Sequence, residues 1–156
     1  MPIVYISLGA ILIGIIVYGF VYVHQKKVSE TIKNQTNIVL ETYGVIKNEH
    51  HHTLLDINGI TYQILYAYVP SNAELTINSK IMWEIRDSSK PRLINQQHFL
   101  SSKYPKIVIV YPSALVIKRY INENEMEFVK YNKMFYDMYV CRHFELETLL
   151  KELKDA

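Results

Sequence analysis

The sequence predicts an α/β protein of the α+β type, in which an N-terminal transmembrane helix precedes one mixed-sheet domain with flanking helices. First, the run from Ile3 to Val23 carries no charge. Second, short runs rich in β-branched and aromatic residues then alternate with segments of helical periodicity. Third, KIVIVYP at 106–112 is continuously apolar, as expected for a strand covered on both faces. With 156 residues, 49% of them hydrophobic, the chain suits one compact domain plus an appendage.

The apolar run predicts a membrane anchor. About 21 helical residues, each rising about 1.5 Å, span the ~30 Å hydrocarbon core of a bilayer. A cleaved signal peptide is the alternative, but it has a basic segment before a shorter apolar core. Neither feature is present here. We therefore expect residues 1–24 to form an anchor that contacts the lipid bilayer through residues 3–23.

The flanking charges predict the orientation of this anchor. Lys26, Lys27 and Lys33 follow the apolar run, whereas no lysine or arginine precedes it. The excess of positive charge on the cytoplasmic side places the C-terminal domain in the cytoplasm and the N-terminus outside the cell membrane. Cys141 is the only cysteine, so an internal disulfide is excluded, which fits a reducing compartment.

A juxtamembrane helix over residues 25–44 is expected next. Val28, Ile32, Val39 and Tyr43 recur at helical spacing, and Gly44 is suited to the position that ends a helix. The remaining residues, 45–156, are expected to form the cytosolic α/β domain.

The first half of this domain predicts a hairpin, a strand and a short helix. Asn58-Gly59 is a strong type I′ turn signal between two apolar runs at 52–69. In the predicted strand 80–86, Trp83 faces one side and Glu84 the other. A polar loop at 87–92 and a short helix at 93–100 follow.

The second half predicts β-rich structure and a final helix. After the buried strand at 106–112, the runs at 115–121 and 126–129 form a hairpin around residues 122–125. A last strand is expected at 138–142. Leucines at helical spacing then predict an amphipathic helix over 144–154.

The predicted order of helix, three strands, helix and strand, over residues 28–112, resembles the core of the restriction-endonuclease-like (PD-(D/E)XK) nuclease fold. In that family an early acidic residue and a Glu-x-Lys on a later strand hold one or two divalent cations. The matching positions are Asp56 and Glu84-Ile85-Arg86. The resemblance therefore implies Asp56, Glu84 and Arg86 as catalytic residues, Asp56 and Glu84 as metal ligands, and Mg²⁺ or Mn²⁺ as cofactor.

The sequence departs from the family pattern at Arg86, which stands where the family has lysine. Arginine does not lose its proton, so Arg86 cannot be a base, although it can hold a phosphate. Asp56 also precedes a turn, where aspartate is common for local reasons. The alternative interpretation of Glu84 and Arg86 is the solvent face of a half-buried strand.

Basic residues predict a second kind of site. Residues 80–119 contain eight Lys/Arg and two Asp/Glu, whereas residues 122–156 contain five Lys/Arg and eight Asp/Glu. Lys90, Arg92, Lys118 and Arg119, together with Lys103 and Lys106, are candidates for binding phosphate groups of nucleic acid or anionic lipid if the fold gathers them. The alternative is local charge in contact with solvent.

Histidines and the cysteine give two weaker hypotheses. His50 and His52 would share a strand face and bind a transition metal if His98 or His143 supplied a third ligand. The alternative is a polar connector. Cys141 and His143 would form a nucleophile and base only at hydrogen-bonding distance. The alternative for Cys141 is a small buried apolar side chain.

These observations leave three function classes. The first is a single-pass, membrane-anchored protein whose cytosolic domain is a binding module, with a protein as the expected partner. The second is a metal-dependent nuclease-like enzyme, intact or degenerate. The third is a surface that binds anionic lipid or nucleic acid through the basic residues of the 80–119 segment.

Overall fold

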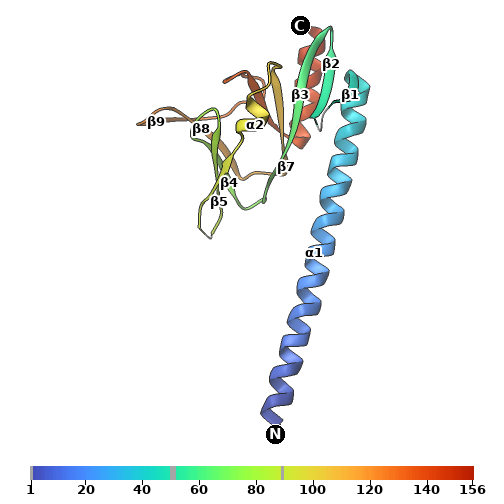
Figure 1. Ribbon diagram of the computed structural model, residues 1–156, viewed down its shortest axis with the longest axis vertical. Helices are drawn as coiled ribbons and strands as arrows, with labels where there is room; N and C mark the ends of the chain where they lie inside the picture. Colours follow the sequence, from blue (N-terminus) through green and yellow to red (C-terminus); the bar gives the residue numbers. More distant parts are fainter. Residues whose placement is uncertain (1, 50–51, 89) are drawn as a thin grey trace.

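The computed structural model describes residues 2–49, 52–88 and 90–156. It is an α+β protein in which one long apolar helix precedes two mixed sheets of five strands and a short C-terminal helix (Figure 1). The sequence predicted one mixed sheet, whereas the strands of the described chain divide into two.

The first sheet, sheet A, combines a meander with two parallel strands. Its order is β1 (Val45–Glu49), β2 (His52–Ile57), β3 (Ile60–Val69), β7 (Lys106–Pro112) and β10 (Met138–Arg142). β1, β2 and β3 are antiparallel neighbours, and β7 and β10 run parallel to β3. Asn58 and Gly59 have φ angles of 51° and 80°, as the predicted type I′ turn requires.

The second sheet, sheet B, is formed largely by the chain between β3 and β7. Its order is β6 (Arg92–Asn95), β5 (Met82–Arg86), β4 (Glu74–Ile77), β8 (Val116–Asn122) and β9 (Glu125–Phe128). β4 and β8 are parallel, and the other neighbours are antiparallel. The hairpin predicted around residues 122–125 is confirmed.

Two local predictions need correction. The helix predicted over residues 93–100 is β6 followed by the short helix α2 (Gln97–Leu100). The residue at 94 pairs with Trp83 and packs against the core, so tertiary contacts impose an extended backbone there. β1 and β4 were not predicted at all.

The core lies in two layers on the two faces of sheet A. On one face α1 (Pro2–Tyr43) and α3 (Leu146–Asp155) pack against β2, β3, β7 and β10. On the other face Val108 and Val140 pack against Leu75, Trp83 and Ile117 of sheet B. A 3-10 turn, η1 (His143–Glu145), connects β10 to α3.

The helix α1 is uninterrupted and joins the apolar run to the domain. It is long and apolar enough to cross a membrane, and its apolar window is not buried in the protein. Farther along, the Tyr66 hydroxyl donates a hydrogen bond to Asn37 Oδ1 at 2.6 Å. Lys33 Nζ lies 5.3 Å from the centre of the Tyr111 ring, and Leu40 is fully buried. The segment 25–44, predicted as a juxtamembrane helix outside the 45–156 domain, therefore contributes to the core of the domain.

Candidate functional site

The outer face of sheet B carries a group of polar side chains that includes two ion pairs. Strand alternation sends Trp83 and Ile85 into the core, so Glu84 and Arg86 point away from sheet A. The large helices lie on the opposite side of sheet A. Met126 and Phe128 on β9 remain half and three-quarters exposed. This face is thus available to another molecule.

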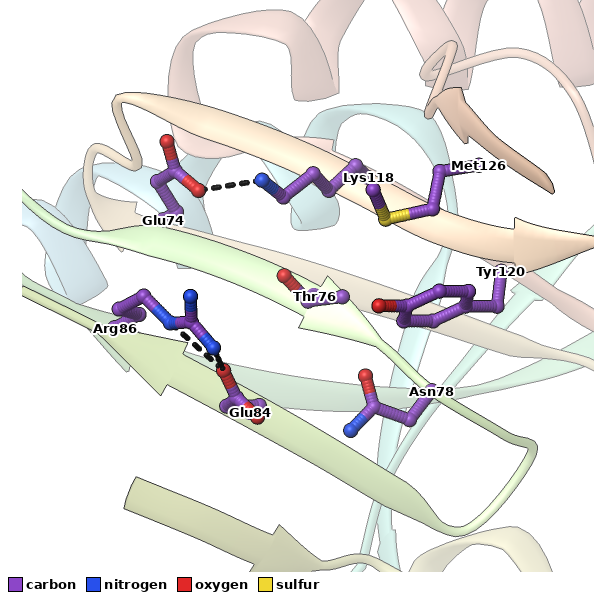
Figure 2. Close-up of a pocket in the computed structure, with 8 residues that line it drawn as sticks. All are labelled: Glu74, Thr76, Asn78, Glu84, Arg86, Lys118, Tyr120 and Met126. Carbon is purple, nitrogen blue, oxygen red and sulfur yellow. Dashed lines mark hydrogen bonds and ion pairs between the residues drawn. The ribbon is translucent and has the colours of Figure 1, made fainter. Parts of the chain in front are cut away.

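A small hollow lies at the centre of this face. Glu84, Thr76 and Lys118 are register neighbours on β5, β4 and β8, so their side chains form one row across the sheet. The hollow has a volume of about 130 Å³. Figure 2 shows its lining, which consists of Glu74, Thr76, Asn78, Glu84, Arg86, Lys118, Tyr120 and Met126.

Two ion pairs fix the charges of the hollow. Lys118 Nζ lies 2.6 Å from Glu74 Oε2 across the β4–β8 pair. Arg86 donates from Nη2 and Nε to Glu84 Oε1, at 2.8 and 3.0 Å. Glu84 is only 17% exposed, so its interaction with Arg86 is less screened than that of a fully solvated pair. The hollow therefore presents two cations and two carboxylates, with no net charge.

One acceptor in the hollow is unsatisfied. Asn78 Oδ1 is buried and has no hydrogen-bond partner within the part of the chain that the structure describes. Thr76, beside it on the same strand face, is 6% exposed. A buried polar atom without a partner is costly, so a donor from water or from a bound molecule would stabilise it.

The size of the hollow decides between kinds of ligand. Drug-sized molecules occupy pockets of about 300–1,000 Å³, whereas one water takes about 30 Å³. A volume of about 130 Å³ thus suits a few waters or one polar side chain. A second hollow of about 350 Å³ adjoins it, shares Glu74, Lys118 and Met126, and adds Val116, Glu127 and Phe128. Together they form a groove, polar at β5 and apolar at β9, which we call the sheet B groove.

The structure brings together only part of the predicted catalytic set. Glu84 and Arg86 lie in the hollow, as a strand face shared by residues i and i+2 requires. Asp56 lies on β2 in sheet A, where its Oδ1 accepts a hydrogen bond from the Gly59 N–H at 3.1 Å. Asp56 and Glu84 are therefore in different sheets. Among the described residues no group of three His, Cys, Asp or Glu could hold a metal ion.

The predicted anion-binding residues do not gather on one face. Lys118 faces the hollow and pairs with Glu74, whereas Arg119 faces the opposite side. There its Nη2 lies 2.5 Å from Glu127 Oε1, and its guanidinium lies 4.5 Å from the Phe135 ring.

The other members of the predicted basic surface are similarly dispersed. Lys106 is buried and donates to the backbone carbonyls of Ser102 and Tyr104, at 2.8 and 2.5 Å. Burial lowers the pKa of Lys106. Arg92 lines a separate cavity on the core side of β5 and β6. Lys90 is exposed in the loop after β5, and Lys103 lies over the Tyr104 ring. The excess positive charge of the 80–119 segment is thus spread over both faces.

The histidine and cysteine hypotheses gain no supporting geometry. His52 Nδ1 is hydrogen-bonded to Gln63 Nε2 at 2.8 Å, while His50 and the side chain of His98 lie outside the described residues. The Cys141 thiol points to the Val108 carbonyl at 3.8 Å, and His143 Nδ1 is buried without a hydrogen-bond partner among the described residues. Burial raises the pKa of Cys141 and lowers the pKa of His143. Cys141 is a buried core residue.

Cys141 is therefore expected to resist thiol reagents in the folded protein. Its side chain is fully buried, so a reagent cannot reach the sulfur. Burial also raises its pKa, so little of the reactive thiolate is present. Full-length protein should react with Ellman's reagent only after denaturation, with one thiol appearing. Fast labelling of the native protein would show that β10 opens readily, because Cys141 lies on that strand.

Several residues of the groove were not identified from the sequence. Lys118 and Tyr120 share a strand face, and that alternation was visible. Glu74 and Thr76 were missed because the strand that carries them is only four residues long, and Asn78, which directly follows this strand, was missed with them. Comparison of the chain with protein-family models, with curated proteins and with solved structures gave no match.

Proposed function

We propose that the chain is a single-pass membrane protein whose C-terminal domain is an interaction module that binds a protein partner in the sheet B groove. The unsatisfied Asn78 Oδ1, in a hollow that suits one polar side chain, is the observation that carries the proposal. A side chain of a partner that donates a hydrogen bond would satisfy this acceptor.

The chemistry of the groove indicates the kind of partner segment. Its polar part holds equal numbers of positive and negative side chains. It therefore favours a segment that carries charges of both signs over a polyanion such as nucleic acid. Its other part presents Val116, Met126 and Phe128, and methionine and aromatic side chains are enriched at protein interfaces. We infer that the bound segment places a polar side chain in the hollow and an apolar one on β9.

The cellular setting follows from the helix. The apolar part of α1 anchors the chain in the cell membrane, and the cations at residues 26, 27 and 33 favour a cytoplasmic domain with the N-terminus outside. The partner is then a cytoplasmic or membrane-proximal protein.

Site-specific photocrosslinking in native membranes tests the proposal. A photoreactive amino acid at Met126 should give a defined crosslinked product. The same amino acid at Val45, exposed on sheet A, should not. The crosslinked protein is then purified, and its affinity for the full chain is measured in detergent.

A matched pair of charge reversals completes the test. Lys118→Glu should weaken binding of that partner about tenfold or more, which corresponds to about 1.4 kcal/mol. Lys151→Glu, on the exposed side of α3, is the control and should change the affinity little. Equal crosslinking from both positions, or an unchanged affinity of the Lys118 variant, would contradict the proposal.

A metal-dependent nuclease remains the alternative function, and one observation favours it. Glu84 and Arg86, which match the second motif of the resemblance, lie together in the hollow. Asp56 and Glu84, however, lie in different sheets.

A thermal-shift experiment separates the two functions. We expect Mn²⁺ to leave the melting temperature of the wild type and of Glu84→Gln equally unaffected, because Glu84 is already paired with Arg86. A cation that bound through Glu84 would stabilise the wild type by about 2.7 kcal/mol at a hundred times its Kd. A rise in Tm that Glu84→Gln abolishes would favour the nuclease and would justify assays on DNA and RNA.

A further inference from the structure

One edge of the domain faces the end of α1 that carries the apolar run. β3, β7 and β10 are parallel, so their C-terminal ends lie along the same edge of sheet A. In Figure 1 this edge is turned toward the N-terminal part of α1, and the chain that joins β3 to β4 passes along it. We call this region, residues 69–73, 112–115 and 142–144, the strand-end edge.

The strand-end edge meets α1 around a second cavity. The cavity has a volume of about 260 Å³. It is lined by His24, Gln25, Val28 and Ser29 of α1 and by Tyr68, Ser71 and Pro112 of the domain. Hydroxyl, amide and imidazole groups therefore surround it, together with the apolar surfaces of Val28 and Pro112.

The position of this cavity along α1 sets its depth relative to a bilayer. The uncharged run ends at Val23, and the helical lining begins at the next residue. At about 1.5 Å per residue, residues 24–29 cover the first ~9 Å beyond that run. The headgroup layer on each side of a bilayer is about 5–8 Å thick. The cavity thus lies at the level of the headgroups of any bilayer that the apolar run spans.

Exposed apolar side chains occur on the same edge. Leu115 is 62% exposed and Phe144 is 61% exposed. One interaction holds their segments together, because Arg142 Nε donates a hydrogen bond to the Ala114 carbonyl at 3.1 Å. Large apolar side chains that face water are unfavourable, whereas the boundary between headgroups and acyl chains stabilises them.

We propose that the strand-end edge rests in the headgroup layer of the bilayer that α1 spans, with Leu115 and Phe144 inserted at the boundary with the acyl chains. A phospholipid headgroup occupies the cavity between α1 and Tyr68. The inference depends on the membrane anchoring proposed above. It adds a lipid-binding site and fixes the face of the domain that lies on the membrane.

Fluorescence quenching by spin-labelled lipids tests this arrangement in the full chain, reconstituted in phosphatidylcholine vesicles. A polarity-sensitive fluorophore is attached to Ser71→Cys, Leu115→Cys or Phe144→Cys, one at a time. Phe128→Cys, on exposed β9 of sheet B, is the control for the soluble domain. Ile13→Cys, within the apolar run, is the control for the anchor. The native Cys141 is buried and should not compete for the label.

The expected result is a depth-dependent pattern. A nitroxide on the headgroup should quench the label at Ser71 several-fold more than the label at Phe128. A nitroxide near the top of the acyl chain should do the same for Leu115 and Phe144, with a blue shift of their emission. A nitroxide deep in the acyl chain should quench only the label at Ile13.

The controls distinguish the two ways in which the inference can fail. In the first, the label at Ile13 is quenched by the deep nitroxide, but the labels at Ser71, Leu115 and Phe144 are quenched no more than the label at Phe128. The membrane anchoring is then supported, and the strand-end edge does not touch the bilayer. In the second, the label at Ile13 is not quenched either. The membrane anchoring is then wrong, and so is the lipid site that depends on it. Agreement among three labels on separate segments guards against one perturbed variant.

Discussion

Replacing Leu40 with alanine is expected to lower the free energy of unfolding by about 2–5 kcal/mol, as for other buried leucines. Leu40 lies on α1 and is fully buried against Leu55, Leu149 and Leu150. The loss should be seen in urea unfolding of the full chain in mild detergent, followed by circular dichroism. It would show that α1 stabilises the domain.

Ile38→Ala is the matched control for this experiment. Ile38 lies two residues earlier on the same helix and is 64% exposed, so its truncation should change the free energy of unfolding by less than about 0.5 kcal/mol. Similar effects of the two variants, whether both large or both negligible, would contradict the docking of α1 on sheet A. The domain would then begin after Gly44, as the sequence predicted.

The second large effect is expected at Trp83, in the core between the sheets. Trp83 is fully buried among Leu75, Ile77 and Val110, so Trp83→Ala should cost about 3–5 kcal/mol of unfolding free energy. Its Nε1–H has no partner among the described residues. Trp83→Phe removes that unpaired donor, which offsets part of the lost contact area, and should cost clearly less.

Circular dichroism is the suitable probe for both variants, because Trp83 is the only tryptophan and its fluorescence is lost with it. Urea unfolding of the two variants beside the wild type gives the order of stabilities. If Trp83→Phe is as destabilising as Trp83→Ala, the indole N–H makes an interaction that the structure does not show. A small loss in both would mean that the two sheets are not packed face to face.

Local signals in the sequence predicted the elements that local chemistry determines. The Asn58-Gly59 turn needs positive φ at both central residues, and its neighbours supply two apolar strands. The strand at 106–112 is apolar throughout because helices cover one face and sheet B the other. By contrast, β4 has four residues, and besides the nearby β5 it pairs with β8, about forty residues later. No local pattern specifies such a pairing.

The candidate site was predicted in part for the same reason. Glu84 and Arg86 share a face because strand periodicity is local, and the sequence was sufficient for that. The same rule places Lys118 and Arg119 on opposite faces, so grouping them as one anion site was avoidable. The separation of Asp56 from Glu84 depends on the division into two sheets, which is a property of long-range pairing.

The continuity of α1 has a mechanical consequence. No proline, glycine or loop interrupts the chain between Phe20 and Tyr43, so the domain shares one stiff axis with the apolar run, which we propose is the membrane segment. A rotation or tilt of the membrane segment is therefore transmitted to both sheets as a rigid-body motion. Two neighbouring copies whose membrane helices changed their crossing angle would swing their sheet B grooves toward or away from each other. In the proposed setting, a motion of the helix inside the bilayer would therefore change the orientation of the sheet B groove.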